Sequence, residues 1–565
     1  MRVRRSQDSP ERFPNLPAWL LAVAGVVVAT NVVMMVAGAI QGGVTLDEPS
    51  HVHRLQGFLA NGWYVADKWV IDGKVTQEGG YVYAPAVALL GHLLGVLVGV
   101  ESWDTVSENA TAYSLRHLVV VTLGAIGIAA VAVTARLLLR SWRWGLVAAA
   151  ILTAIPMYIG HAMFNIKDLP VAAGYAAATL GAVALTQSTI TTPRMRLLAG
   201  GALAFGVWLT AGVRPAMLVS VGVSVAVALF ASWLRMRRDA PATRARLKAG
   251  TITAAGGSLV GYLALVAIYP KLFLRPELLY QSVVQSGDFP WHLSTLTAGT
   301  FMPAQSAPAS YLPLWFAAQT PVVTSLLCLG VIVWFVRQAF LPATRKPGDG
   351  NLLAGVAVIL VQALFFPWAA IAGGSTLYQG PRQMLFVVPA MALLATIGVF
   401  LVARAVLASR RPRVVSALWV AAGAMLAVTT LSSAAIFPYA YTWFNATTAL
   451  RPIDGNWVVD VEWQSSREVL PKVDSIDPER CVLLQPRTHC DRDQVAPFTN
   501  LIGSDVGAPL AVGEVWRLAY GSPVARTDAP GVDRDLVHDC RRVDAVTRQL
   551  FWRTVTMSTV ERCRR

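Results

Sequence analysis

Two adjacent carboxylates, Asp47 and Glu48, follow the first long apolar run of the chain, and His51 stands one helical turn beyond them. Neighbouring carboxylates repel one another, and acid/base or metal chemistry is one reason to keep such a pair beside an apolar segment. The alternative is structural, because an Asp two residues before Pro49 is also a good start signal for a helix. The residue types favour a catalytic role for the pair and a substrate-binding role for His51.

A second polar group lies between two apolar stretches, in residues 161–170. Lys167 and Asp168 could simply form an ion pair at an interface, and Pro170 could simply begin the next helix. So dense a polar set between two apolar helices nevertheless favours a functional site. We interpret Asp168 as a further catalytic carboxylate and the others as substrate-binding residues: His161, Asn165 and Lys167.

Two arginines, Arg214 and Arg382, stand at the ends of apolar segments, and Tyr378 lies close to the second. A guanidinium group can hold a phosphate through two parallel hydrogen bonds. The alternative is that each side chain extends to the lipid headgroups, as any arginine at a membrane interface can. Together with the acidic groups, these residues suggest a site that binds a phosphate-containing substrate.

The elements that position these residues must be membrane helices. Charged residues make up 14% of the 565-residue chain and apolar residues 55%, with a mean hydropathy of +0.52. Soluble domains contain about 25% charged residues. Apolar runs of about 20 residues, enough to cross a bilayer as helices, recur between residues 17 and 436. These properties exclude a soluble globular protein and predict a multi-pass membrane protein whose partner is the lipid bilayer.

The distribution of charge predicts how the chain is oriented. The net charge is +15, but the basic residues flank alternate ends of the apolar runs, which is typical of membrane proteins rather than of nucleic-acid binders. Four arginines place residues 1–16 in the cytoplasm, so residues 41–114 form an outer loop. A cleaved signal peptide is a weak alternative, because the first apolar run is too long. Residues 84–100 must then form a juxtamembrane or re-entrant helix, and about eleven spans remain within residues 17–436.

An odd number of spans places the tail, residues 437–565, outside the cytoplasm. Four of the five cysteines lie in this tail (Cys481, Cys490, Cys540 and Cys563), and an even number suits disulfide bonds. Zinc binding is a rival interpretation, without a CxxC pair to support it. Short strand patterns occur at 457–461 and 481–484. The predicted fold class is therefore an all-α polytopic membrane protein with a small extracytoplasmic α+β C-terminal domain.

Five segments of the chain resemble one known family. They are residues 47–51, 165–170, 311–321, 378–389 and 439–445, and the resemblance extends from about residue 17 to 470. In order and in predicted sidedness they resemble GT-C fold glycosyltransferases, in particular the protein O-mannosyltransferase-like group of glycosyltransferase family 39 and its bacterial relatives. One departure is Tyr83-Ala84-Pro85, where many relatives have His-Pro-Pro, and it concerns the acceptor more than the reaction.

The resemblance implies roles for individual residues. Asp47 resembles the catalytic acid that acts as general base on the acceptor hydroxyl, and Glu48 resembles its neighbour. Asp168 resembles a residue that helps to bind a divalent cation in some GT-C enzymes, so Asp47 and Asp168 are candidate ligands for Mg²⁺ or Mn²⁺. Arg214 and Arg382 are candidate phosphate ligands. The donor would be a polyprenyl-phosphate sugar, and the acceptor an envelope glycan, lipid or protein at the plasma (inner) membrane.

Two rival functions remain open at this point. A transporter or flippase of lipid-linked sugars would share the spans and the interfacial arginines, but transporters place their polar groups at mid-membrane. An inactive scaffold that binds cell-wall components through its tail would not explain the acidic loops. The sequence contains no Walker loop, GxSxG or HExxH motif, so hydrolysis of nucleotides and serine-hydrolase or zincin chemistry have no support.

Overall fold

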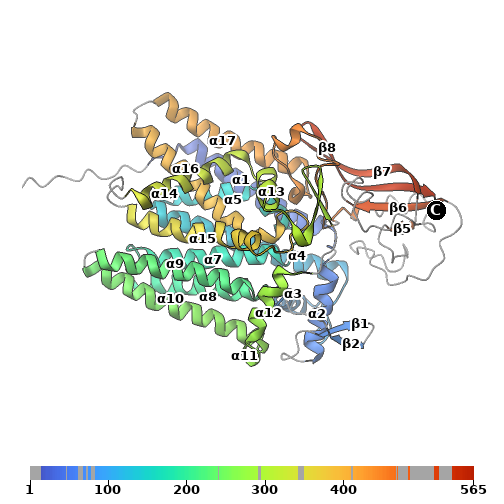
Figure 1. The fold of residues 1–565 in the computed structure, drawn as a ribbon, viewed down its shortest axis with the longest axis horizontal. Helices are drawn as coiled ribbons and strands as arrows, with labels where there is room; N and C mark the ends of the chain where they lie inside the picture. Colours follow the sequence, from blue (N-terminus) through green and yellow to red (C-terminus); the bar gives the residue numbers. More distant parts are fainter. Residues whose placement is uncertain are drawn as a thin grey trace, which may run out of the picture.

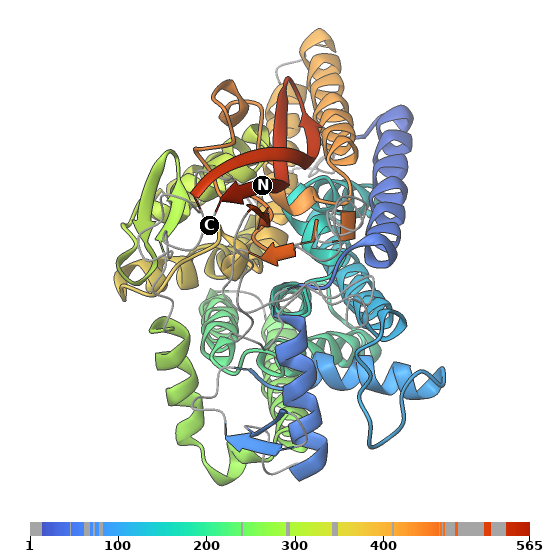
Figure 2. The same ribbon diagram turned by 90° about the vertical axis from the view of Figure 1, so that its right-hand side faces the viewer.

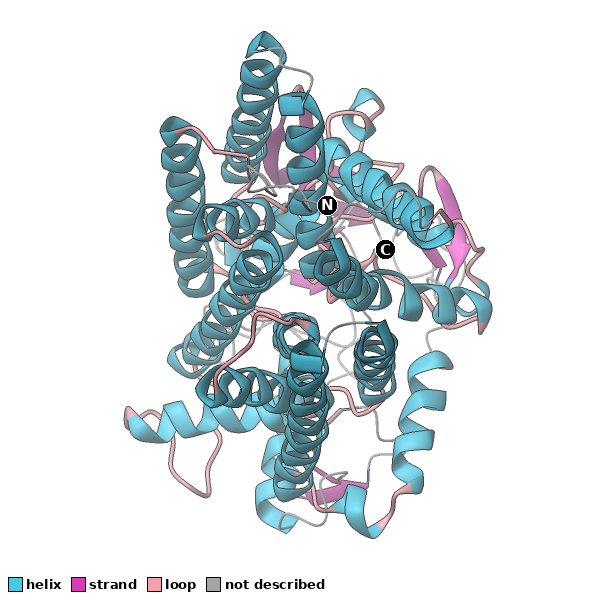
Figure 3. Ribbon diagram, turned by 90° about the vertical axis from the view of Figure 1, so that its left-hand side faces the viewer, coloured by secondary structure: helices cyan, strands magenta, loops and turns pink. Residues whose placement is uncertain are grey.

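The computed structural model describes residues 14–45, 47–61, 68–71, 74–77, 83–238, 241–289, 294–341, 349–408, 412–462, 464–465, 467–468, 481–483, 514–520 and 538–564. These residues form a bundle of long helices with strands gathered at one end (Figure 1). From the opposite end the long helices are seen nearly end-on, with the strands behind them (Figure 3). Among the described residues, one end of the bundle consists of helix ends and the other is covered by additional helices and strands; we call the latter the covered end.

Among the described residues, nine helices are long and apolar enough to cross a membrane. They are α1 (Ala18–Gln41), α4 (Ala110–Leu139), α7 (Asp168–Thr186), α9 (Met217–Arg238), α10 (Pro241–Ile268), α14 (Val322–Phe340), α15 (Asp349–Ala372), α16 (Val387–Ala408) and α17 (Pro412–Ala435). A tenth span results if α5 (Trp142–Thr153) and α6 (Pro156–Ala162), which meet at 75°, are counted together. The chain is a multi-pass membrane protein, as predicted.

The sequence predicted about eleven spans, one more than the ten counted when α5 and α6 are taken together. The additional predicted span is α8 (Pro193–Ala211). Arg194 and Arg196 in its first turns lower its hydropathy, so α8 does not qualify by composition. It nevertheless packs tightly in the bundle between α7 and α10. A Cβ atom on Gly206 would lie 2.3 Å from the backbone nitrogen of Ala178, and such close backbone contact through small residues is characteristic of membrane helices.

The loop after α1 contains the predicted juxtamembrane helices. It consists of α2 (Glu48–Asn61), an antiparallel hairpin of β1 (Lys68–Ile71) and β2 (Lys74–Gln77), and α3 (Ala86–Leu97). With 12 residues, α3 is too short to span, which agrees with the prediction for residues 84–100. The covered end also holds α11 (Lys271–Leu274), α12 (Glu277–Gly287), the hairpin of β3 (Ser294–Thr297) and β4 (Thr300–Pro303), and α13 (Tyr311–Gln319) (Figure 1).

The tail contains a four-stranded sheet in the order β5-β6-β8-β7, built from β5 (Cys481–Leu483), β6 (Glu514–Tyr520), β7 (His538–Leu550) and β8 (Arg553–Arg564). Only β5 and β6 are parallel. The sheet lies over one part of the covered end, whereas α2 and its hairpin lie over another (Figure 2). The strand predicted at 481–484 is present over Cys481–Leu483, but 457–461 is irregular: Trp457 N–H donates to the Ile453 carbonyl, and Val458 N–H donates to the Leu296 carbonyl of β3.

Residues 437–462, which we call the tail base, join α17 to the sheet and pack into the covered end. Asn445 N–H donates to the Ala318 carbonyl of α13 at 2.9 Å. The backbone of Tyr441 passes so close to Gly160 of α6 that a Cβ there would lie 2.1 Å from the Tyr441 nitrogen. The tail is thereby tied to the membrane bundle at its first residues. Cys490 and the side chains of Cys481, Cys540 and Cys563 lie outside the described part, so their disulfides stay a prediction.

Candidate active site

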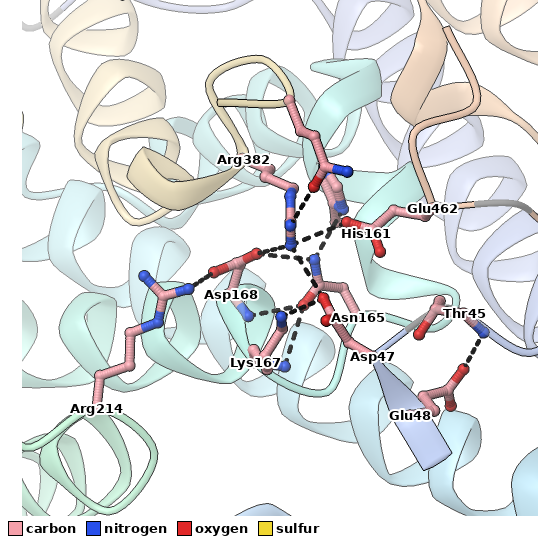
Figure 4. A network of polar contacts seen from close by, with 11 residues as sticks. Thr45, Asp47, Glu48, His161, Asn165, Lys167, Asp168, Arg214, Arg382 and Glu462 are labelled. Carbon is pink, nitrogen blue, oxygen red and sulfur yellow. Dashed lines mark hydrogen bonds and ion pairs between the residues drawn. The ribbon is translucent and has the colours of Figure 1, made fainter. Parts of the chain in front are cut away.

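Three carboxylates and three cations from five separate places in the chain converge at the covered end (Figure 4). They are Asp47 before α2, Lys167 and Asp168 at the start of α7, Arg214 between α8 and α9, Arg382 at the start of the 3-10 helix η3 (Arg382–Met384), and Glu462 in the tail base. We call these six residues the charge cluster. Arginines extending into lipid would not meet in this way, so the shared-site interpretation of Asp47, Asp168, Arg214 and Arg382 agrees with the geometry.

Asp47 is the most accessible carboxylate of the cluster, with 34% of its side chain exposed. It forms an ion pair with Lys167, and its Oδ2 lies 3.6 Å from Nη1 of Arg382. Burial works to raise the pKa of Asp47, but Lys167 and Arg382 hold it well below its usual range. Burial also works to lower the pKa of Lys167, which Asp47 raises above its usual value. Both groups are therefore charged at neutral pH.

Asp168 is buried and fixed by the turn that precedes α7. The Asn165 Oδ1 atom accepts hydrogen bonds from the backbone N–H groups of Lys167 at 3.0 Å and Asp168 at 2.7 Å, which is a side-chain turn of the kind Asn favours. Asn165 Nδ2 also donates to Asp168 Oδ2 at 3.1 Å. The carboxylate forms an ion pair with Arg214 and lies 3.5 Å from Nη1 of Arg382. The turn thus directs Lys167 to Asp47 and Asp168 to the two arginines.

Arg382 stands at the centre of the cluster. Its side chain is 5% exposed, and Nη1 lies 2.9 Å from Glu462 Oε1. Gln379 accepts a hydrogen bond from Nη2. Gln379 and Gly380 have φ angles of 56° and 79°, a left-handed turn that glycine adopts without cost, and Tyr311 Oη accepts a bond from Gly380 N–H at 3.1 Å. The segments 311–321 and 378–389 therefore position Arg382 together.

Glu462 is a site residue that sequence reasoning missed. It is 3% exposed, and its Oε1 atom has no hydrogen bond of good geometry among the described residues, although Arg382 lies close by. Burial raises the pKa of Glu462 to about 7, with Arg382 opposing the shift and Asp47 adding to it. No motif surrounds Glu462 in the sequence, so only its contact with Arg382 identifies it.

Glu48 does not join Asp47 in the cluster. Its Oε2 accepts a hydrogen bond from Thr45 N–H at 2.6 Å, and its Oε1 lies 2.7 Å from Nε2 of the buried His117 in α4. The two adjacent carboxylates thus point to different partners. This geometry fits a role for Glu48 in holding the loop after α1 against α4. The contacts of Glu48 with Thr45 and His117 do not support its predicted role in catalysis.

His51, a predicted site residue, lies beside the cluster together with Tyr83. Tyr83, which was not predicted as a site residue, packs edge-on against His51, with 5.3 Å between ring centroids, and its ring lies 5.5 Å from Lys167 Nζ and 5.7 Å from Arg214 Cζ. The sequence could have pointed to Tyr83, because it lies in the Tyr83-Ala84-Pro85 segment, where the chain differs from the His-Pro-Pro of many relatives in the family it resembles. Burial, with Arg54 and Lys167, holds the pKa of His51 well below its usual value, so the ring is neutral.

His161 and Tyr378 support the two loops of the site. His161 Nδ1 lies 3.1 Å from Asn165 Nδ2, and its ring is 5.7 Å from that of Tyr441. The Tyr378 ring stacks on Phe289 and lies 5.7 Å from Arg382 Cζ. Burial raises the pKa of Tyr378, so its hydroxyl stays protonated. Both residues touch groups that hold the charge cluster.

An open cavity of about 210 Å³ begins beside Arg214. Its polar lining includes Tyr83, Arg214 and Tyr378. Its other walls are mostly apolar and come from α9, α12 and α15, with Met217, Val219, Val283, Phe365, Phe366 and Ala369 among them. A cavity of this kind suits a ligand with an anionic head and an apolar tail.

The residues present do not fit the divalent cation that the family resemblance suggested. Asp47 and Asp168 each face protein cations, and no group of three or more His, Cys, Asp or Glu side chains that could hold a metal occurs within the described ranges. Mg²⁺ and Ca²⁺ are bound by oxygen ligands, and a neighbouring ammonium or guanidinium group competes for the same carboxylates.

We therefore expect activity to survive removal of divalent cations. Preincubation of the purified protein with EDTA should leave the rate of the reaction unchanged, because Lys167, Arg214 and Arg382 already supply the positive charge. The measurement is the initial rate before and after chelation. A loss that Mg²⁺ or Mn²⁺ restores would contradict this expectation.

Comparison with known proteins gives matches in fold alone. No family model and no curated protein matches the chain. Among solved structures, the chain is similar to ArnT from Cupriavidus metallidurans bound to undecaprenyl phosphate, with 13% identity, a TM-score of 0.44, and coverage of 96% of this chain and 98% of that chain. It is similar to apo ArnT from the same organism at 14% identity, with a TM-score of 0.44 and coverage of 96% and 97%.

Proposed function

We propose that this protein is a membrane glycosyltransferase of the GT-C type, which moves a sugar from a polyprenyl-phosphate donor to an acceptor on the extracytoplasmic face. The observation that carries the proposal is the meeting of a partly exposed carboxylate, Asp47, with Lys167 and Arg382, in a cluster whose third cation, Arg214, lines an apolar cavity. A base, a phosphate-binding group and a place for a lipid tail are the three parts that such a transfer needs.

Two buried arginine N–H groups support the binding of a phosphate. The Nε atoms of Arg214 and Arg382 are buried and have no hydrogen-bond partner among the described residues. Leaving a buried donor unpaired costs about 1–3 kcal/mol, and an incoming phosphate oxygen would satisfy it. The apolar walls beside Arg214 would receive the first isoprene units of the donor.

The chemistry follows from these positions. The acceptor oxygen forms a bond to the anomeric carbon while the bond from that carbon to the phosphate oxygen breaks, and its electron pair leaves with the phosphate. Asp47 takes the acceptor proton as general base. Its low pKa does not prevent this, because the hydroxyl becomes strongly acidic as its oxygen bonds to the anomeric carbon. Arg214 and Arg382 stabilise the charge that develops on the phosphate, and a single displacement inverts the anomeric centre.

The arrangement of the cluster favours an enzyme over a flippase. The six residues of the charge cluster come from loops and helix ends at the covered end of the bundle (Figure 1), where their side chains converge (Figure 4). A transporter would need polar groups near the midplane. In the proposed orientation residues 1–16 are cytoplasmic and the tail is extracytoplasmic, at the plasma (inner) membrane. The acceptor would be an envelope glycan, lipid or protein.

Reconstitution tests the proposal directly. Purified protein in liposomes is incubated with radiolabelled polyprenyl-phosphate sugars and an envelope extract, and the label is followed into new products. We expect label to move to an acceptor with the wild type and not with the Asp47→Asn variant. Label that crosses the bilayer without leaving its lipid would favour the flippase, and label that neither crosses nor transfers would reject the enzyme.

Arg214→Ala should weaken donor binding. A charge-assisted hydrogen bond contributes about 1.5–3 kcal/mol, so the Kd for the donor should rise about ten- to hundredfold. Binding of labelled donor in detergent measures the change. Arg194→Ala is the matched control, because Arg194 lies in the first turn of α8, at the end of that helix away from Arg214, and the change is expected to leave the Kd unchanged. An unchanged Kd in Arg214→Ala would show that Arg214 does not bind the donor.

A further inference from the structure

Three carboxylates share one nitrogen atom of Arg382. Nη1 lies 2.9 Å from Glu462 Oε1, 3.5 Å from Asp168 Oδ2 and 3.6 Å from Asp47 Oδ2. Lys167 and Arg214 are the other two cations of the cluster. With every group ionised, the positive and negative charges of the cluster balance before any substrate is present.

Sugar transfer would disturb this balance. The donor is a phosphodiester with one negative charge, and the departing prenyl phosphate, as a monoester with a second pKa near 6, gains another at neutral pH. An uncompensated charge in a buried site costs several kcal/mol. The acceptor hydroxyl also releases a proton in the same step. A carboxylate that takes up this proton beside Arg382 would cancel the added charge.

We propose that Glu462 is the final acceptor of that proton, and that its neutralisation releases Arg382 to bind the departing phosphate. The inference rests on the proposed function. The acceptor O–H bond breaks, the proton passes through Asp47 to Glu462 Oε1, and Glu462 changes from one negative charge to none. The phosphate gains one negative charge with the electron pair of the broken glycosidic bond, so the total charge of the site stays constant.

Geometry selects Glu462 among the carboxylates. Asp168 is held by Arg214 and by Asn165 Nδ2, so both of its oxygens are engaged. Glu462 Oε1 has no hydrogen bond of good geometry within the part of the chain that the structure describes, and it can carry a proton. Asp47 and Glu462 both lie within 3.6 Å of the same nitrogen, so a proton has only a short path between them, directly or through water.

The electrostatics around Glu462 agree with this role. The groups that face it from neighbouring elements are Arg382 of η3, Asp47 before α2, Lys167 and Asp168 at the start of α7, and Tyr441 of the tail base. Burial raises the pKa of Glu462 to about 7, whereas that of Asp47 lies well below its usual range. A proton delivered to Asp47 therefore passes on to Glu462 with a favourable free energy.

Binding of prenyl phosphate alone tests the proposal without turnover. Wild-type affinity for this product should fall as the pH rises above about 7, because ionised Glu462 then competes for Arg382. Glu462→Gln imitates the protonated side chain at every pH. At pH 8 it should bind prenyl phosphate about tenfold more tightly than the wild type, since only about one tenth of wild-type Glu462 is then protonated. The phosphate's own titration affects both proteins and cancels in the ratio of their affinities.

Turnover provides the second measurement. Glu462→Gln should transfer sugar about a hundredfold more slowly or worse, because the proton has no final acceptor. Glu468→Gln is the matched control, since Glu468 follows in the same segment but pairs with Arg548 of the tail sheet, and it should behave as the wild type in both assays. If Glu462→Gln does not fold, Glu462→Asp should keep the pH-dependent affinity and turn over slowly.

The outcomes separate this inference from the proposed function. Equal product affinity in wild type and Glu462→Gln from pH 6 to 8.5 would overturn the inference, as would normal turnover by Glu462→Gln. A pH-independent affinity in Glu462→Asp would do the same. A wild type that binds prenyl phosphate with the expected pH dependence but transfers no sugar would instead reject the proposed enzyme.

Discussion

Replacing Asp47 with Asn is expected to reduce turnover by about 10³-fold while the protein still folds and binds its donor. The amide has almost the shape of the carboxylate but cannot take the acceptor proton. Lys167 and Arg382, which Asp47 contacts, remain to hold the phosphate. The measurement is the rate at saturating donor, together with the donor Kd from direct binding.

Two variants serve as controls for Asp47→Asn. Asp104→Asn alters an exposed Asp outside the charge cluster that accepts hydrogen bonds from the Ser102 and Thr105 hydroxyl groups, and it should leave turnover unchanged. Glu48→Gln should lower thermal stability more than the chemical rate, because Glu48 contacts His117 and Thr45 instead of the cluster. If Asp47 only capped α2, Asn would replace it at almost no cost, since Asn caps a helix as well as Asp does. Near-normal turnover by Asp47→Asn would thus favour the cap.

Replacing Arg382 with Met should remove measurable donor binding and also lower the stability of the fold. The variant loses the central phosphate ligand and leaves Asp47, Asp168 and Glu462 close together without their shared cation. Removing one partner from a buried ion pair costs about 3–5 kcal/mol. Donor binding and the midpoint of thermal unfolding in detergent measure the two effects.

Additional variants separate charge from geometry at this position. Arg382→Lys keeps the charge but not the planar fork, and we expect it to recover stability without recovering full donor affinity. Adding Glu462→Gln to Arg382→Met removes one of the stranded negative charges and should recover part of the lost stability, which a double-mutant cycle quantifies. If Arg382→Met binds the donor with wild-type affinity, Arg382 is not a phosphate ligand.

The sequence alone determined the membrane architecture and several members of the site. Apolar runs of about 20 residues have few ways to satisfy their backbone in a bilayer, so their helical structure is almost forced by composition. The short helix α3 followed from the charge that flanks α4. Asp47, Asp168, Arg214 and Arg382 could be identified because charged residues beside apolar segments are costly and therefore conspicuous.

Only the tertiary structure decided how those residues are paired. Asp47 and Glu48 were predicted as one acidic pair, but Glu48 begins α2, and the turn there directs the two side chains to Lys167 and to His117. Glu462 entered the site because the tail base folds back over the covered end. Hydropathy and charge patterns describe each segment of the chain separately. Contacts between loops depend on how distant helix ends pack, and no local pattern encodes that packing.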